Sequence, residues 1–166
     1  MSIFDGIDKA NVQRDSEFIR PGRYFFRVDS IRSGTTRKGD QFVVFNFTCV
    51  HVVDDTAAAD EPKGPHRVSD RISWMVMKSW DTFLSTIKSS VKALTGCTEE
   101  EVTVEAVNAI IGDQQPLAGM YCELDATTKI TRNNGKFTKV AIRRAVEPSE
   151  LLTVVPPHVA QTFKLK

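Results

Sequence analysis

Two short segments of the chain concentrate cationic side chains that are suited to binding phosphate groups. Arg37 and Lys38 lie in the segment SGTTRKGD, and Arg132 and Lys136 lie in the segment TRNNGK. Each segment stands directly before a run of β-branched and aromatic residues. A turn explains the glycines and the aspartate of the first segment, but it does not require the adjacent arginine and lysine.

The charges of the chain are segregated although its formal net charge is only +1. Residues 20–44 hold six basic and two acidic residues, and residues 126–144 hold six basic and no acidic residues. Residues 95–125 hold seven acidic and no basic residues. A basic face is therefore predicted despite the near-neutral total.

Binding a single-stranded nucleic acid requires cations along the backbone and flat rings on which bases stack. The candidate cations lie in the two segments and the strands beside them: Arg37, Lys38, Arg67, Arg71, Lys129, Arg132, Lys136, Lys139 and Arg143. The candidate rings are Phe42, Phe45, Tyr121 and Phe137. A strand phenylalanine is more often core than surface, and basic loops can simply keep a protein soluble, so these alternatives stay open.

Apolar patterning predicts five β-strands. They are residues 22–31, 41–50, 67–76, 120–131 and 137–146. The first two form a hairpin, and the second is apolar on both faces, which indicates burial on both sides. The last two are joined by RNNGK, a hairpin turn signal that carries Asn134-Gly135.

The hydrophobic period changes to three and four residues between the third and fourth strands. Met77, Trp80, Leu84, Ile87, Val91 and Leu94 follow this helical spacing, and Gly96 is a natural stop. Thr98 and Glu101 then form a capping-box pattern before a second short helix that ends at Gly112.

Three strands, a helical segment and a closing hairpin predict a mainly β protein of the α+β kind, a five-stranded OB-fold barrel with helices between strands 3 and 4. Another small β-barrel and an open α+β sheet are the alternatives. The OB-fold binds oligonucleotides through the loops after strands 1 and 4, and here both loops are basic. The expected division is a leader at residues 1–19, the barrel at 20–146 and an extension at 147–166.

The blocks TTRKGDQFVVFNFTCV and NNGKFTKVAIRRA resemble the small phage-encoded single-stranded DNA-binding proteins of OB-fold type found in replication and recombination clusters, and the opening MSIFDGIDKA is similar to their leader. In pattern the resemblance covers residues 1–146. It implies a DNA-binding, non-enzymatic protein that coats and protects single strands during bacteriophage DNA replication or recombination in the cytoplasm of a bacterial host. Replication or recombination proteins would be its partners, although many such proteins recruit partners through an acidic tail and this chain ends TFKLK.

The sequence carries no pattern typical of catalysis or metal binding. No P-loop, HExxH, GxGxxG or paired-carboxylate signature is present, and Cys49, Cys97 and Cys122 are far apart, as suits a reducing cytoplasm. We therefore expect no enzyme, no cofactor and no metal. No apolar run reaches the length of a membrane span, so no membrane association is expected. The alternative function is a structural or interaction protein, such as a virion component or a host-factor inhibitor.

The last 18 residues are too apolar for a solvated linker. The segment contains Leu151, Leu152, Val154, Val155, Val159 and Phe163 around two prolines. Such a segment must cover apolar surface, either on its own barrel or on a neighbouring copy of the protein. Self-association through this extension and packing on the same barrel are the two expectations.

Overall fold

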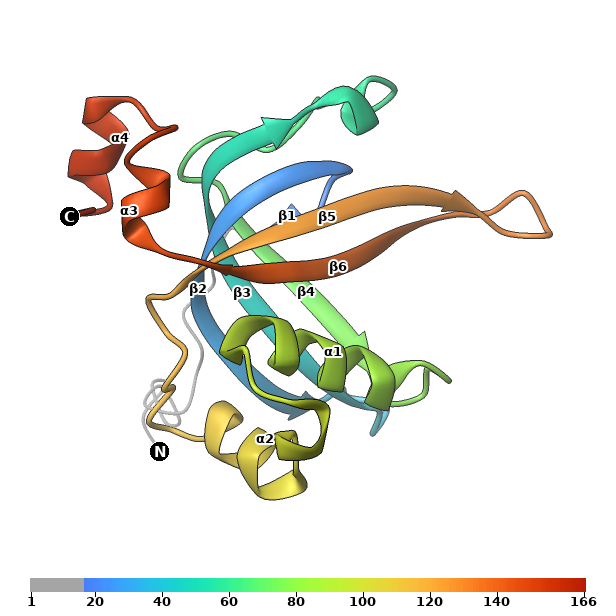
Figure 1. Cartoon of the computed structure of the whole chain (residues 1–166). Helices are drawn as coiled ribbons and strands as arrows, with labels where there is room; N and C mark the ends of the chain where they lie inside the picture. The colour runs from blue at the N-terminus through green and yellow to red at the C-terminus, as the bar shows by residue number, and fades with distance from the viewer. Residues whose placement is uncertain (1–16) are drawn as a thin grey trace, which may run out of the picture.

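A curled sheet of six strands organises the chain in the computed structural model, which describes residues 17–166 (Figure 1). The strands are β1 (Glu17–Phe18), β2 (Gly22–Thr35), β3 (Gln41–Asp54), β4 (Arg71–Met77), β5 (Tyr121–Ile130) and β6 (Lys136–Val146). The helices are α1 (Phe83–Thr95), α2 (Val104–Ile111), α3 (Pro148–Leu151) and α4 (Pro157–Thr162), with short 3-10 turns at Thr56–Ala58 and Glu99–Glu101. Residues 1–16 of the expected leader lie outside the described residues.

The strands follow the order β1-β4-β3-β2-β5-β6, and all neighbours are antiparallel except β1 and β4. Three register shifts interrupt the pairing of β2 with β3, and such bulges bend a strand, which explains the curl. The five predicted strands are present and a sixth, β1, joins them. β4 and β6 are not neighbours in the sheet, so hydrogen bonds do not close it into the expected five-stranded barrel.

The inner face of the curl is packed by a chain of aromatic rings. Tyr24 stacks on Phe26 with ring centroids 5.0 Å apart, and Phe26 lies 5.4 Å from Phe47. Phe45 continues the chain, 6.2 Å from Phe47 and 4.9 Å from Trp74. These contacts join β2, β3 and β4 through side chains as well as through backbone hydrogen bonds.

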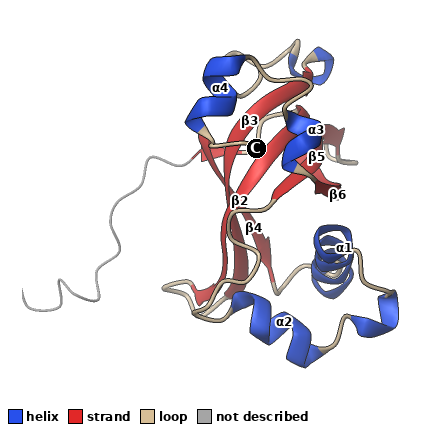
Figure 2. Ribbon diagram, turned by 60° about the vertical axis from the view of Figure 1, so that its left-hand side comes forward, coloured by secondary structure: helices blue, strands red, loops and turns tan. Residues whose placement is uncertain are grey.

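Helices α1 and α2 cover one end of this core, between β4 and β5 in the chain (Figure 2). α1 buries Ile87, Val91 and Leu94 as predicted, and it ends at Gly96, whose φ of 69° is the left-handed conformation that favours glycine. It begins at Phe83 and not at Met77, because Met77 belongs to β4. Among residues 17–166, no helix combines the length and the apolar composition needed to cross a bilayer.

Helix α2 is not capped by the predicted residues. The capping box of Thr98 and Glu101 is formed, but it starts only the 3-10 turn Glu99–Glu101. The helix itself is capped by Thr103, whose hydroxyl oxygen accepts a hydrogen bond from the Ala106 N–H at 3.2 Å. The sequence pattern therefore correctly predicted a capping box, but this box caps the 3-10 turn that precedes α2 and not α2 itself.

Strand β4 begins at Arg71, four residues later than predicted. The preceding residues form a turn in which the Arg67 N–H donates to the Asp70 carboxylate at 2.8 Å and Ser69 has a φ of 75°. Ile72, Trp74 and Val76 point inward from the strand, as their alternation predicts.

The extension at residues 147–166 packs on the outer face of its own sheet. Leu151, Val159 and Phe163 from α3, α4 and the residue after α4 form a second buried cluster with Phe25, Val50, Tyr121 and Val146. The Tyr121 hydroxyl donates to the Phe163 carbonyl oxygen at 3.3 Å. The expectation of packing on the same sheet is confirmed, which explains why β2, β3 and β5 are apolar on both faces.

Two adjacent leucines of the extension test this packing. Leu151 is 0% exposed and Leu152 is 42% exposed. We expect Leu151→Ala to lower the free energy of unfolding by about 2–5 kcal/mol, because it leaves a cavity, whereas Leu152→Ala should stay within about 0.5 kcal/mol of the unmodified protein. Urea denaturation followed by circular dichroism measures both values. Equal effects of the two substitutions would contradict the docked extension.

Candidate nucleic-acid interface

The β2–β3 loop holds Arg37 and Lys38 exposed at its tip. The Thr36 N–H donates to the Asp40 carbonyl oxygen at 2.8 Å, and the Gly39 N–H donates back to the Thr36 carbonyl oxygen at 2.9 Å. Gly39 has a φ of 90°, which a side-chain-bearing residue rarely adopts. The closed loop presents both cations to solvent at one end of β2.

The β5–β6 hairpin presents the second group of cations. The loop spans residues 131–135, longer than a two-residue Asn-Gly turn. The Thr131 N–H donates to the Gly135 carbonyl oxygen at 2.7 Å, and Asn134 adopts a φ of 60°, the left-handed conformation that asparagine tolerates. Arg132 and Lys136 are exposed there. In the strands behind the turn, Lys129 pairs with Phe137 across the hairpin, and both side chains are exposed.

The two loops lie at opposite ends of β2. Gly22, at the start of β2, pairs with Ala126 of β5, and Thr35, at its end, pairs with Gln41 of β3. The β5–β6 hairpin projects beyond the rest of the sheet, to the right in Figure 1. The sequence predicted that both loops flank one groove directly. Because they lie at opposite ends of β2, the two loops do not form such a groove by themselves.

Ion pairs divide the basic residues of the structure into two groups. Eight of the nine predicted cations form no ion pair with any acid of residues 17–166. They are Arg37, Lys38, Arg67, Arg71, Lys129, Arg132, Lys136 and Lys139. The ninth, Arg143, pairs with Asp125, so its charge is largely compensated.

The paired arginines gather around two acids on β5. Glu123 is buried and accepts hydrogen bonds from the guanidinium groups of Arg23 and Arg144. Arg144 also forms an ion pair with Glu150 of α3, with Nη2 2.6 Å from Oε1. Because acids already neutralise these arginines, they contribute little free positive charge, and the eight unpaired predicted cations lie on the two loops, on β5 and β6 beside the hairpin, and at β4 and the turn before it.

Two of the four predicted ring platforms are part of the core. Phe45 is stacked between Phe47 and Trp74 on the inner face, and Tyr121 lies beneath the C-terminal extension. Neither can stack on a base in this structure, so their assignment to the interface is wrong. Phe42 is half-buried against Gly34, while Phe137 is exposed on the basic hairpin.

Sequence reasoning missed two exposed rings and one cation. Phe18, which stood in the expected leader, is on β1, and Trp80 lies in the turn before α1. Trp80 fits the helical spacing with Leu84, but its neighbours Lys78, Ser79 and Asp81 are all polar, which was a signal of exposure. Arg32 is exposed on β2 and forms no ion pair with the acids of the described chain.

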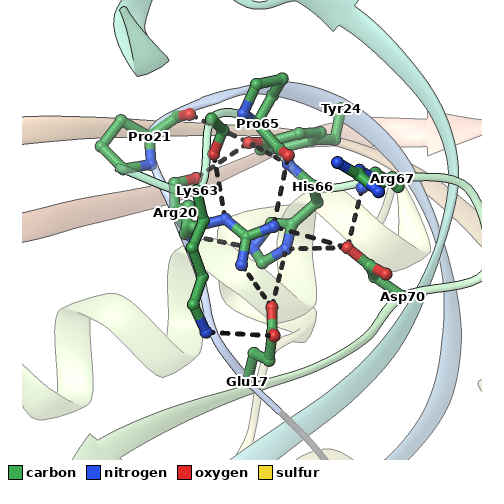
Figure 3. Close-up of polar contacts among 10 residues, drawn as sticks. Glu17, Arg20, Pro21, Tyr24, Lys63, Pro65, His66, Arg67 and Asp70 are labelled. Atoms are coloured by element: carbon green, nitrogen blue, oxygen red, sulfur yellow. Dashed lines mark hydrogen bonds and ion pairs between the residues drawn. The ribbon is translucent and has the colours of Figure 1, made fainter. Parts of the chain in front are cut away.

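A polar cluster joins β1, the start of β2 and the loop before β4 (Figure 3). Arg20 lies at its centre, paired with Glu17 and 3.5 Å from Asp70, and its Nε donates to the Gly64 carbonyl oxygen at 3.0 Å. His66 is buried beside it, with Nδ1 3.7 Å from Glu17 and 3.6 Å from Asp70. The cluster anchors the short parallel strand β1 to the rest of the sheet.

The spacing of Glu17, His66 and Asp70 would suit a metal ion, but the hydrogen bonding of the histidine does not. His66 Nε2 accepts a hydrogen bond from the Arg20 backbone N–H at 2.9 Å, so the ring proton of the neutral histidine is on Nδ1, the atom that faces the two carboxylates. A protonated nitrogen cannot coordinate a metal, and the Arg20 guanidinium already supplies the positive charge. We therefore interpret the cluster as a structural joint.

Burial in this joint makes the stability of the protein depend on pH. Desolvation, followed by the nearby Arg20 charge, lowers the pKa of His66 from 6.5 to about 4. Because the pKa is depressed in the folded state, the unfolded state takes up the proton first, and stability falls as the pH decreases from about 6.5 to 4.

We expect His66→Gln, which retains an acceptor for the Arg20 N–H, to remove up to about 3 kcal/mol of this loss. Urea unfolding of both proteins at several pH values between 7 and 4 measures the difference, which cancels the carboxylate contributions that the two proteins share. Parallel pH profiles would show that the histidine is not held neutral by folding.

Comparison with known proteins adds no relative to this description. The chain matches no protein-family model, and a search of curated proteins returns no match. Its function therefore has to be inferred from its own residues and their geometry.

Proposed function

We propose that this chain is a single-stranded DNA-binding protein that tolerates many sequences. The observation that carries this function is the separation of its basic residues into two groups. Arginines near the extension are neutralised by acids, whereas the cations of the two loops and β4 have no acidic partner in residues 17–166. Uncompensated cations that follow a surface are suited to the repeating phosphates of a nucleic-acid backbone.

Exposed rings favour a single strand over a duplex. Phe137 lies on the same hairpin as Arg132 and Lys136, and its register partner is Lys129. An aromatic face can stack on a base only when that base is not already stacked and paired in a duplex. Stacking also discriminates weakly between bases, which is consistent with sequence-tolerant binding.

An open form of the OB-fold is our proposal for the sheet at residues 20–146. Strands β2 to β6 and the helical insertion follow the chain order of that fold, and β2 pairs with both β3 and β5. The difference is the unpaired seam between β4 and β6. In this fold the loops that correspond to β2–β3 and β5–β6 contact oligonucleotides, and here both are basic.

The biological role that we propose is the coating and protection of single strands during phage replication or recombination. It is supported by the resemblance of the two sequence blocks to phage proteins of this type. In this role the protein acts without catalysis or a cofactor, in the cytoplasm of a bacterial host. Contact between adjacent copies would have to use the surface that the docked extension leaves exposed, such as Leu152 and Val154.

Salt dependence provides the first test of this function. We expect a labelled dT oligonucleotide to bind more tightly than the corresponding duplex, with log affinity falling by about 0.7 per log unit of salt for each phosphate neutralised. Fluorescence anisotropy at several salt concentrations measures the slope, and a dA oligonucleotide tests sequence tolerance. Absence of binding, or affinity that is indifferent to salt, would favour a structural or interaction protein instead.

Charge reversal tests which cations contact the strand. We expect Arg37→Glu/Lys38→Glu and Arg132→Glu/Lys136→Glu each to weaken binding and to reduce the salt slope by at least about 1.4, because each removes two phosphate contacts. The matched control is Lys164→Glu/Lys166→Glu, which makes the same change in net charge at the opposite end of β6. An equal loss of affinity in the control would mean that only total charge matters.

A further inference from the structure

A groove of about 1160 Å³ follows the open seam of the sheet between β4 and β6. Its walls are β4 from Ser73 to Met77, one face of α1 and the first half of β6. Figure 1 shows the elements that supply these walls, with β6 above α1. Small-ligand pockets are typically about 300–1,000 Å³, so this groove has room for more than one nucleobase.

Three exposed aromatic rings line the groove. Phe18 is 83% exposed, Trp80 is 47% exposed and Phe137 is 51% exposed. They come from three separate elements, so a local sequence pattern does not explain their convergence. Exposed rings around one groove are costly to leave in water, and they are the surface on which unpaired bases stack.

The groove has polar groups but no acid. Ser85, Thr86 and Ser89 of α1, and Thr82 just before it, contribute hydroxyls that can donate or accept hydrogen bonds. Lys139 is the charged side chain among the lining residues, and none of them is acidic. This combination suits bases and a phosphate backbone better than it suits a cationic ligand.

The two ends of the groove lie near the two basic loops that β2 separates, although neither loop lines the groove itself. At one end are Phe137 and Lys139, at the base of the β5–β6 hairpin. At the other end are Met77 and Trp80, which flank Lys78. The Lys78 N–H and Nζ both donate to Gln41, at 2.9 and 2.8 Å, and Gln41 directly follows the β2–β3 loop.

We infer that the bases of the bound single strand enter this seam groove and stack on Phe18, Trp80 and Phe137, while the backbone runs from one basic loop to the other. This inference rests on the proposed function. It assigns the bound single strand a path along the groove between β4 and β6. Open edges can also accept an added peptide strand. The protruding rings, the hydroxyls and the adjoining cations favour the nucleic acid.

Trp80 offers a direct readout of base stacking. The protein has two tryptophans, and Trp74 is largely buried. We expect a dT oligonucleotide to quench the fluorescence of the unmodified protein, and Trp80→Phe to remove most of the quenching while retaining a ring for stacking. Quenching that persists in Trp80→Phe would overturn the inference.

Affinity measurements on ring variants provide the second readout. We expect Phe18→Ala and Phe137→Ala each to weaken dT binding by about 5-fold to 150-fold, the effect of about 1–3 kcal/mol per stacked base. The control is Leu84→Ala, because Leu84 is highly exposed on α1 but does not line this groove. Since all these side chains are exposed, circular dichroism should be unchanged.

The outcomes separate the groove from the function. If charge reversal of the loops weakens binding but the ring variants bind as tightly as the Leu84 control, the strand follows another surface and only the groove assignment fails. If the unmodified protein does not bind the oligonucleotide, both the groove assignment and the proposed function fail.

Discussion

The chain of stacked rings across β2, β3 and β4 is the constraint on which the rest of the structure depends. Tyr24, Phe26, Phe47, Phe45 and Trp74 contact one another in succession on the inner face of the curl. Large rings bury much apolar area each, so this chain fixes how the three strands pack against one another on the inner face. It also commits half of the aromatic residues of the strands to the core.

A second layer on the outer face determines where the positive charge remains. The C-terminal extension covers Phe25, Val50 and Tyr121, and the same region holds the buried Glu123 with its two arginines. A buried carboxylate has to be paired, so these arginines act in stability. The eight predicted cations without an acidic partner in residues 17–166 lie elsewhere, on the two loops, the strands of the β5–β6 hairpin, and β4 with the turn before it.

The incomplete closure of the sheet links the fold to the proposed function. β4 and β6 remain unpaired to each other while α1 packs beneath them, which leaves a groove with two strand edges as walls. Exposed edges usually carry a risk of aggregation. Here the open seam would instead serve as a binding site for a single-stranded nucleic acid, because exposed rings and a cation lie in the groove beside it.

The sequence by itself determined strands β2 to β6, helices α1 and α2 and their order, because alternation, helical spacing and turn residues are local properties, whereas β1, α3 and α4 were not predicted. Gly96 lies where a left-handed conformation ends α1, and the inward residues of β4 follow their alternation. The eight unpaired cations were also recognisable, because their segments contain few acids.

Only the tertiary structure decided which rings are exposed and which charges are neutralised. Tyr121 shares its strand face with the acidic Glu123 and Asp125, yet Phe163 and the other apolar residues of the extension cover it. Trp80 fits a buried helical face, yet the helix begins after it. Burial and ion pairing depend on contacts between segments far apart in the chain. The groove exists because β4 and β6, which residues 78–135 separate in the chain, do not pair with each other. No local pattern encodes such a contact or its absence.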